Sequence, residues 1–236
     1  TLKAVVLPFA ILNVHTATGG NIGNVTVKIS GSLFTPGMTA KIVRGGTTIN
    51  ASALYYTNST TVFATFNLQG APLGLYDISL TKPDSAVAIM INGFSVVAAN
   101  NGGLITGGGP NTGSGNGNAP GCYPGAASGL NSQLVVELIV PPIVLITRPV
   151  VIQINFSNPT NFDIPAQTRI LYSEEGLKMA FTKAGVPTGS TALYIELTEP
   201  GGPPGIIRPG GSGTITVHTA APKFVPPDPL ILFKLK

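Results

Sequence analysis

The chain has 236 residues, of which 9% are charged, compared with about 25% in an ordinary soluble domain. It contains 13 basic and 9 acidic residues, for a net charge of +4, together with 30 glycines, 21 prolines and no tryptophan. Because acid–base catalysis and metal binding need titratable side chains, this composition argues against an enzyme or a cofactor and favours an all-β protein with a structural or adhesive role.

The distribution of charged and apolar residues argues against two further classes. The basic residues lie far apart, whereas nucleic-acid binding needs a basic stripe, so we expect no nucleic-acid partner. The longest apolar stretch, residues 134–145, is interrupted by Glu137 and Pro141-Pro142, so we expect no membrane span. Thr1 in place of Met predicts a processed chain or a piece of a longer one. The weak charge also permits close self-association.

The pattern of residues 1–99 is typical of a β-sandwich domain. An apolar run at residues 2–12, broken by Pro8, predicts two strand pieces or a bent edge strand. The alternating segment V-T-V-K-I-S at residues 25–30 predicts a half-buried strand. Further strands are expected at residues 39–43, 47–51, 61–66, 75–81 and 86–97. The turn signals between them recur about every 8–12 residues, which is the spacing of a sandwich.

Residues 100–131 have a different composition, rich in Gly and Asn. Such a segment cannot bury a core, so we expect a flexible linker between two domains. Its glycine runs lack the preceding strand, the following helix and the lysine of a phosphate-binding loop. The sequence therefore predicts no nucleotide site there.

Residues 132–222 predict a second β-sandwich domain. Strands are expected at residues 134–140, 150–156, 167–172, 177–181, 192–197 and 214–218. A short helix near residues 173–180 is the one helix that the pattern allows.

The tail at residues 223–236 combines a stiff segment with an apolar end. Pro226-Pro227-Asp228-Pro229 predicts an extended conformation. The following L-I-L-F-K-L-K is a strand-forming apolar segment that would aggregate if it stayed unpaired in water. We therefore expect it to pair either with its own domain or with a neighbouring chain. The apolar residues 2–7 at the other end pose the same question.

Two parts of the sequence resemble known Ig-like modules. About residues 8–98 resemble an IPT/TIG-type immunoglobulin-like domain. The opening pattern I-x-G-x-x-F-x-P-G is carried by Ile29, Gly31, Phe34, Pro36 and Gly37, and the ending by G-L-Y-D-I-S-L-T-K-P-D at residues 74–84 and N-G-F-S-V at residues 92–96. Ser85 departs from the glycine that this family usually has there.

The second region resembles CARDB-like modules of large bacterial surface proteins. The resemblance is carried by Q-L-V-V-E-L-I-V-P-P at residues 133–142, I-N-F-S-N-P-T-N-F-D-I-P at residues 154–165 and G-I-I-R-P-G-G-S-G-T-I-T-V at residues 205–217. Together the two resemblances imply two Ig-like β-sandwich domains joined by a Gly/Asn-rich linker, in an extracellular or cell-surface protein. They imply no particular ligand.

The sequence offers few residues for chemistry. His15 and His218 fall in separate predicted domains, so they cannot supply a metal site on their own. The adjacent pair Glu174-Glu175 would point to opposite faces of a strand. Among metal ions, calcium has the most support from the sequence, because Asp77, Asp84 and Asp163 lie near predicted loops and could bind it. However, no D-x-D-x-D spacing supports a calcium site. We expect no catalytic, cofactor or metal site.

The single cysteine, Cys122, lies in the segment G-C-Y-P-G. It is either an exposed residue without a role or a thiol that pairs with another chain or carries an attached group. An intrachain disulfide is excluded because there is no second cysteine.

Three functional hypotheses follow. The leading one is a structural subunit of an extracellular fibre, in which a terminal apolar strand completes the sheet of an identical or sibling module. The proline segment would hold the C-terminal donor away from its own domain. The candidate assembly residues are Leu230, Ile231, Leu232, Phe233 and Leu235 at one end and Leu2, Val5, Val6 and Leu7 at the other.

The two alternatives use the same domains differently. An adhesin module would bind a glycan or a protein through loops at one end of a sandwich, with Tyr55 and Tyr56 as candidate ligand contacts. A spacer would stand beside a catalytic module that this sequence does not contain, and the parent reading frame would then encode that module.

Overall fold

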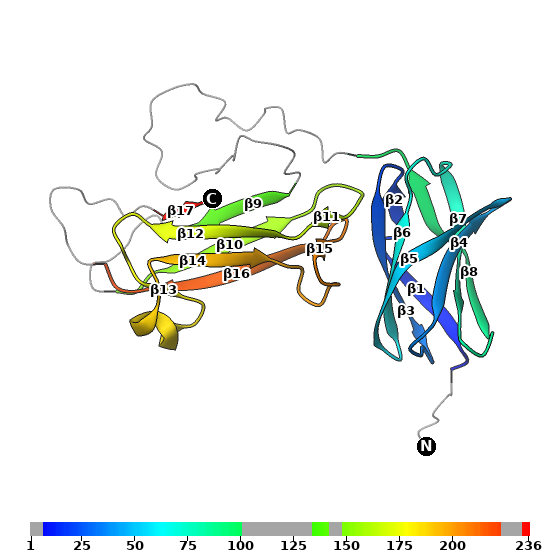
Figure 1. The fold of residues 1–236 in the computed structure, drawn as a ribbon, viewed down its shortest axis with the longest axis horizontal. Helices are drawn as coiled ribbons and strands as arrows, with labels where there is room; N and C mark the ends of the chain where they lie inside the picture. The colour runs from blue at the N-terminus through cyan, green and yellow to red at the C-terminus, as the bar shows by residue number, and fades with distance from the viewer. Residues whose placement is uncertain (1–6, 101–133, 142–147, 223–232) are drawn as a thin grey trace, which may run out of the picture. The chain divides into compact units, whose positions relative to one another are not determined.

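The computed structural model describes residues 7–100, 134–141, 148–222 and 233–236 (Figure 1). Over these residues the regular secondary structure is almost entirely β-strand, and its helical part is one six-residue 3-10 helix, η1 (Lys183–Thr188). The expected all-β class is therefore confirmed, and the sheets form sandwich-like arrangements. The predicted linker lies outside the described residues apart from Asn100.

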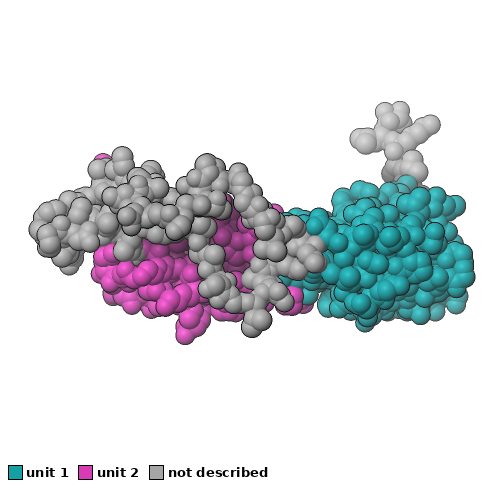
Figure 2. All heavy atoms as spheres, turned by 90° about the horizontal axis from the view of Figure 1, so that it is seen from above, with its two compact units in different colours: residues 1–104, 158–164, 206–210 teal, residues 105–157, 165–205, 211–236 magenta. Residues whose placement is uncertain are grey.

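The chain divides into two compact units, which Figure 2 colours teal and magenta. The first comprises Thr1–Leu104, Asn158–Ile164 and Ile206–Gly210, and the second comprises Ile105–Ser157, Pro165–Gly205 and Gly211–Lys236. Two short segments from the later half of the sequence thus belong to the first unit.

The first unit is built on eight strands in the order β1-β3-β6-β5-β4-β7-β8-β2. The longest of these strands, β5, pairs with β4 through its first residues and with β6 through its later ones. It therefore joins the two halves of the sandwich. The bounds are β1 (Ala10–His15), β2 (Thr18–Gly20), β3 (Asn24–Ser32), β4 (Thr39–Arg44), β5 (Thr47–Asn58), β6 (Thr61–Asn67), β7 (Gly74–Thr81) and β8 (Val87–Val97).

The core of the first unit follows from the alternation of its strands. On β3 the side chains of Val25, Val27 and Ile29 are fully buried, as the strict apolar–polar alternation predicts. They join one apolar cluster with other buried residues of the first unit, among them Ile42, Phe66, Leu68, Tyr76, Ile78, Leu80, Phe94 and Val96. Burial of such side chains is the main favourable contribution to folding.

Residues 158–164 are tied into the first unit by backbone hydrogen bonds. Gly20 N–H donates to the carbonyl of Asn161 at 2.7 Å, and Asp163 N–H donates to the carbonyl of Asn24 at 2.8 Å. The segment that carries the CARDB-like resemblance therefore contributes residues to the unit that contains the IPT/TIG-like segment.

The second unit is built on two sheets, with strand orders β13-β16-β10-β9 and β14-β12-β17. Its fully buried aliphatic residues on strands of these two sheets are Ile152, Ile154, Leu171, Ile195, Leu197 and Val217. A further two-stranded sheet pairs β11 with β15, and β15 together with Ile164 of β11 belongs to the first unit. The bounds are β9 (Val135–Ile139), β10 (Val151–Ser157), β11 (Ile164–Pro165), β12 (Gln167–Ser173), β13 (Met179–Ala180), β14 (Ala192–Leu197), β15 (Ile206–Ile207), β16 (Ser212–Thr219) and β17 (Phe233–Leu235).

The helix expected near residues 173–180 is wrong. Gly176 lies in a turn at φ +68°, a conformation that ends a right-handed helix rather than continuing it. Met179 and Ala180 then pair with β16, and the helical segment begins later, at Lys183. None of the described helices has the length and apolarity needed to cross a bilayer.

Candidate assembly surfaces

The C-terminal strand β17 is the outer strand of a sheet in its own chain. Phe233, Lys234 and Leu235 pair antiparallel with Ser173, Tyr172 and Leu171 of β12. The pairing continues beyond the strand, because Ile170 N–H donates to the carbonyl of Lys236 at 2.8 Å and Lys236 N–H donates back at 3.0 Å. These backbone bonds are the interaction that strand addition uses.

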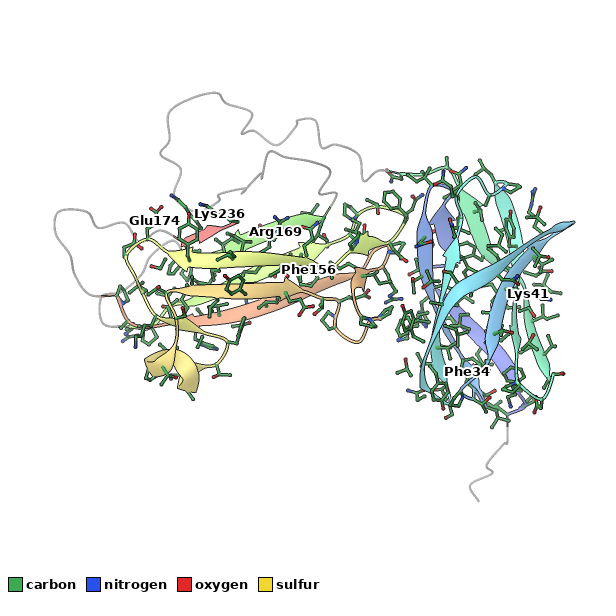
Figure 3. All side chains as sticks on the ribbon, viewed as in Figure 1. Phe34, Lys41, Phe156, Arg169, Glu174 and Lys236 are labelled. Carbon is green, nitrogen blue, oxygen red and sulfur yellow. The ribbon has the colours of Figure 1, made fainter. Side chains whose placement is uncertain are left out.

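The side chains of β17 explain why it lies there. Phe233 is 7% exposed, so its ring is buried in the second unit. Lys234 points outward and pairs with the Glu174 carboxylate. The ammonium of Lys236 lies 5.2 Å from the ring centre of Tyr172. Figure 3 labels Glu174 and Lys236 beside this strand.

The expectation that the proline segment would hold the terminal strand away from its own domain is therefore wrong for residues 233–235. Burying the Phe233 ring in its own sheet removes apolar surface from water, which an extended free strand would leave exposed. Of the remaining candidate assembly residues, Leu7 is exposed. The others lie outside the described residues: Leu2, Val5, Val6, Leu230, Ile231 and Leu232, together with the thiol candidate Cys122.

Tyr55 and Tyr56, the candidate ligand contacts, lie within strand β5 and not in the expected loop, and 38% and 39% of their surfaces are exposed. Successive residues of a regular strand point to opposite faces. Tyr55 and Tyr56 pair in regular register with Phe63 and Val62 of β6, so the two rings lie on opposite faces of the strand, and each is partly exposed.

An apolar stripe on β8 was missed by the sequence reasoning. Val87, Ile89 and Ile91 are 53%, 60% and 75% exposed, and they alternate with the inward-facing Ala88 and Met90. The segment V-A-I-M-I contains no polar residue, so its pattern predicts a strand but does not indicate which face meets solvent. Only the topology shows that β8 lies next to the short β2, which pairs with residues 95–97 alone and leaves this stretch at a sheet edge.

The three aspartates considered for calcium each bond to protein groups instead. Asp163 accepts from Thr26 N–H at 2.9 Å and from Thr26 Oγ1 at 2.6 Å, and Thr26 Oγ1 lies 2.7 Å from Thr65 Oγ1. Asp77 accepts from Asn92 N–H at 2.8 Å, and Asp84 from Ala86 N–H at 3.0 Å. These carboxylates therefore hold nearby backbone N–H groups in place, and Asp163 also holds the hydroxyl of the buried Thr26.

No constellation for metal chemistry is found in the part of the chain that the structure describes. There, no three His, Cys, Asp or Glu side chains come close enough to hold a metal ion. His15 lies on β1 and His218 on β16, as their separation in the sequence implies.

A shallow groove lies over β9, β10 and β16, with a volume of about 330 Å³. Its walls carry amide, hydroxyl and carboxylate groups from Glu137, Asn155 and Thr214, and the Thr214 hydroxyl donates to Asn155 Oδ1 at 2.9 Å. One carboxylate without a second titratable partner does not make the acid–base pair that hydrolysis of a glycoside requires.

Comparison with known proteins assigns no family to the chain. No family model and no curated protein matches it. Among solved structures, the crystal structure of red sea bream transglutaminase matches at 11% sequence identity with a TM-score of 0.22, over 93% of this chain and 27% of that chain. The chain thus spans a minor part of that protein's length, and a likeness this weak carries no argument about fold or activity.

Proposed function

We propose that the chain is a non-enzymatic structural module of an extracellular or cell-surface fibre, built from two Ig-like sandwiches, and that neighbouring copies associate by β-strand addition. The observation that carries the proposal is the position of β17. It is a short apolar strand at the outer side of a three-stranded sheet, and it is held by backbone bonds to β12 and by one buried ring.

An edge strand of this kind can be exchanged between copies without new chemistry. The strand of a neighbour would make the same bonds to β12 and bury the same Phe233 ring, because an exchanged element reproduces the contacts of its own copy. Ten residues separate Pro222 from Phe233 in the sequence, which at about 3.3 Å per residue gives a reach of about 36 Å when extended. Exchange would therefore link one module to the next.

The sparse charge of the chain supports the same proposal. With 9% charged residues and a net charge of +4, copies repel one another weakly. A soluble monomer normally protects its sheet edges with charged residues and prolines. This chain has few charged residues that could protect its sheet edges in that way.

A point substitution at β17 tests the proposal. Phe233→Asp places a carboxylate in a buried site and is expected to abolish assembly, measured by light scattering and electron microscopy. The matched control is Lys234→Ser, which changes the neighbouring outward-facing side chain and is expected to leave assembly intact. An excess of a free peptide of residues 229–236 should shorten the assemblies by occupying β12. Assembly that tolerates both Phe233→Asp and the peptide contradicts the proposal.

A second candidate function is supported by the partly exposed rings of Tyr55 and Tyr56 on β5, since aromatic rings are common contacts at binding surfaces. In an adhesin module, Tyr55→Ala or Tyr56→Ala would abolish capture of a ligand from a glycan or surface-protein array while leaving the unfolding midpoint unchanged. An array on which the wild-type chain captures nothing would remove this candidate.

A further inference from the structure

The strand β8 has an open edge over residues 87–91. Lys82 N–H donates to the carbonyl of Ala86 at 2.9 Å in the turn that joins β7 to β8. Backbone direction alternates along antiparallel strands, so Ala88 and Met90 bond to β7, and Val87, Ile89 and Ile91 direct their N–H and C=O groups to the other side. Among the described residues, β2 pairs with that side of β8 only from Ser95 to Val97.

The far end of this open edge agrees with the same alternation. Ser95 N–H donates to the carbonyl of Ala17 at 2.8 Å, and Val97 C=O accepts from Asn21 N–H at 3.1 Å, so odd-numbered residues face this side there as well. Between the two stretches, Asn92 has a left-handed conformation at φ 54°, and its N–H bonds to Asp77. The open edge is therefore a regular stretch of five residues, 87–91, which ends where Asn92 bonds to Asp77.

The open edge is apolar along its length, and one carboxylate bonds to the backbone just beyond each of its two ends. The outward side chains are Val87, Ile89 and Ile91, each more than half exposed. Within residues 1–100 the only acidic side chains are Asp77 and Asp84, and they bond to the backbone of Asn92 and Ala86, immediately beyond either end of this edge. An occupant should therefore be an apolar strand with a basic residue and no acidic one.

We propose that the open edge of β8 takes residues 2–7 of a neighbouring copy as an added strand. The segment L-K-A-V-V-L is apolar, carries Lys3 and has no acidic residue. Five strand residues extend about 17 Å, so six residues suffice to cover the edge. The other apolar end is not available in the same way, because residues 233–235 already pair with their own β12. The proposal rests on the proposed function and names a second joint between copies.

Two substitutions at Ile89 test the joint. Ile89→Lys puts a charge on the exposed apolar stripe, and Ile89→Pro removes an N–H that faces the open side while leaving the bonds to β7 in place. Both are expected to raise the critical concentration for assembly about tenfold or more, because an added strand loses backbone bonds and apolar contact. The control Val151→Lys adds the same charge at an exposed position on β10 and should leave the critical concentration unchanged.

Cross-linking identifies the occupant. In a Cys122→Ser background, a chain with Val5→Cys is mixed with a chain with Ile89→Cys and treated with a short bismaleimide. The expected product is a covalent pair of the two different chains, formed more than tenfold above a control that carries Val151→Cys in place of Ile89→Cys. A dilute chain that carries both cysteines and cross-links within itself would show that the segment pairs with its own copy, which overturns the proposal.

The failure of this inference can be separated from the failure of the proposed function. If wild-type chains assemble, and both Ile89 variants assemble equally well without a specific cross-link, the β8 joint is wrong while strand addition through β17 stands. If wild-type chains stay single at all concentrations, the proposed function and the β8 joint are both wrong.

Discussion

The side chain of Asn158 makes every hydrogen bond that an asparagine can make. It is 1% exposed, its Nδ2 donates to the carbonyls of Phe162 at 2.8 Å and Ile207 at 2.9 Å, and its Oδ1 accepts from Thr160 N–H at 2.9 Å and Thr160 Oγ1 at 2.7 Å. Two donors and two acceptor positions are thereby satisfied. Asn158 thus joins the two later segments of the first unit to each other.

We predict that Asn158→Asp destabilises the protein although it preserves shape. The carboxylate can keep the two bonds from Thr160, but it has no donor for the carbonyls of Phe162 and Ile207, so the free energy of unfolding should fall by about 2–3 kcal/mol. Denaturant unfolding measures the change. The matched control is Asn67→Asp, which should change stability little, because the Oδ1 of exposed Asn67 accepts from Gln69 N–H and a carboxylate oxygen can accept the same bond. Equal effects of the two substitutions would refute this role of Asn158.

The sequence predicts only the local half of this arrangement. The pattern N-P-T-N predicts a turn, and the bonds between Asn158 and Thr160 make that turn. The bond to Ile207 joins residues 49 positions apart, and the bond from Thr26 to Asp163 joins residues 137 positions apart. Turn chemistry acts over a few residues, so nothing in the local pattern distinguishes Asn158 and Asp163 from ordinary loop residues.

At the scale of elements, strand prediction succeeds where polar and apolar residues alternate. The segment V-T-V-K-I-S gives both the existence of β3 and its buried face. The segment V-A-I-M-I gives the existence of β8 but not its faces, because every residue in it is apolar. The candidate site on β8 therefore depends on topology, which shows that, among the described strands, only β7 pairs with residues 87–91. The misplaced helix has the same origin, since pairing of Met179 and Ala180 with β16 overrides the local pattern.

Gly31 sets how closely β1 can approach β3. A Cβ at this position would lie 2.1 Å from the carbonyl oxygen of Ala10 and 2.5 Å from Cζ of Phe34, while Gly31 is the register partner of Ile11. We predict that Gly31→Ala lowers the free energy of unfolding by about 1–3 kcal/mol, because the backbone of β1 must move. The control Gly46→Ala has open space around the new methyl. Thermal unfolding in which both variants melt together would contradict this account.

At the scale of the whole molecule, the chain combines sparse charge with apolar strands at sheet edges. Such edges are a liability for a soluble monomer, whereas they are the means of association in a protein that polymerises by strand addition. The two joints that we propose use opposite ends of the sequence, with β17 on β12 and residues 2–7 on β8. Two separate joints would allow each copy to contact more than one neighbour.

Electron microscopy of the purified 236-residue chain over a range of concentrations tests the central claim, self-association by strand addition, most directly. The account predicts regular filaments above a critical concentration, and their loss in Phe233→Asp but not in Lys234→Ser. Discrete single particles at every concentration, or filaments that Phe233→Asp leaves unchanged, would contradict it.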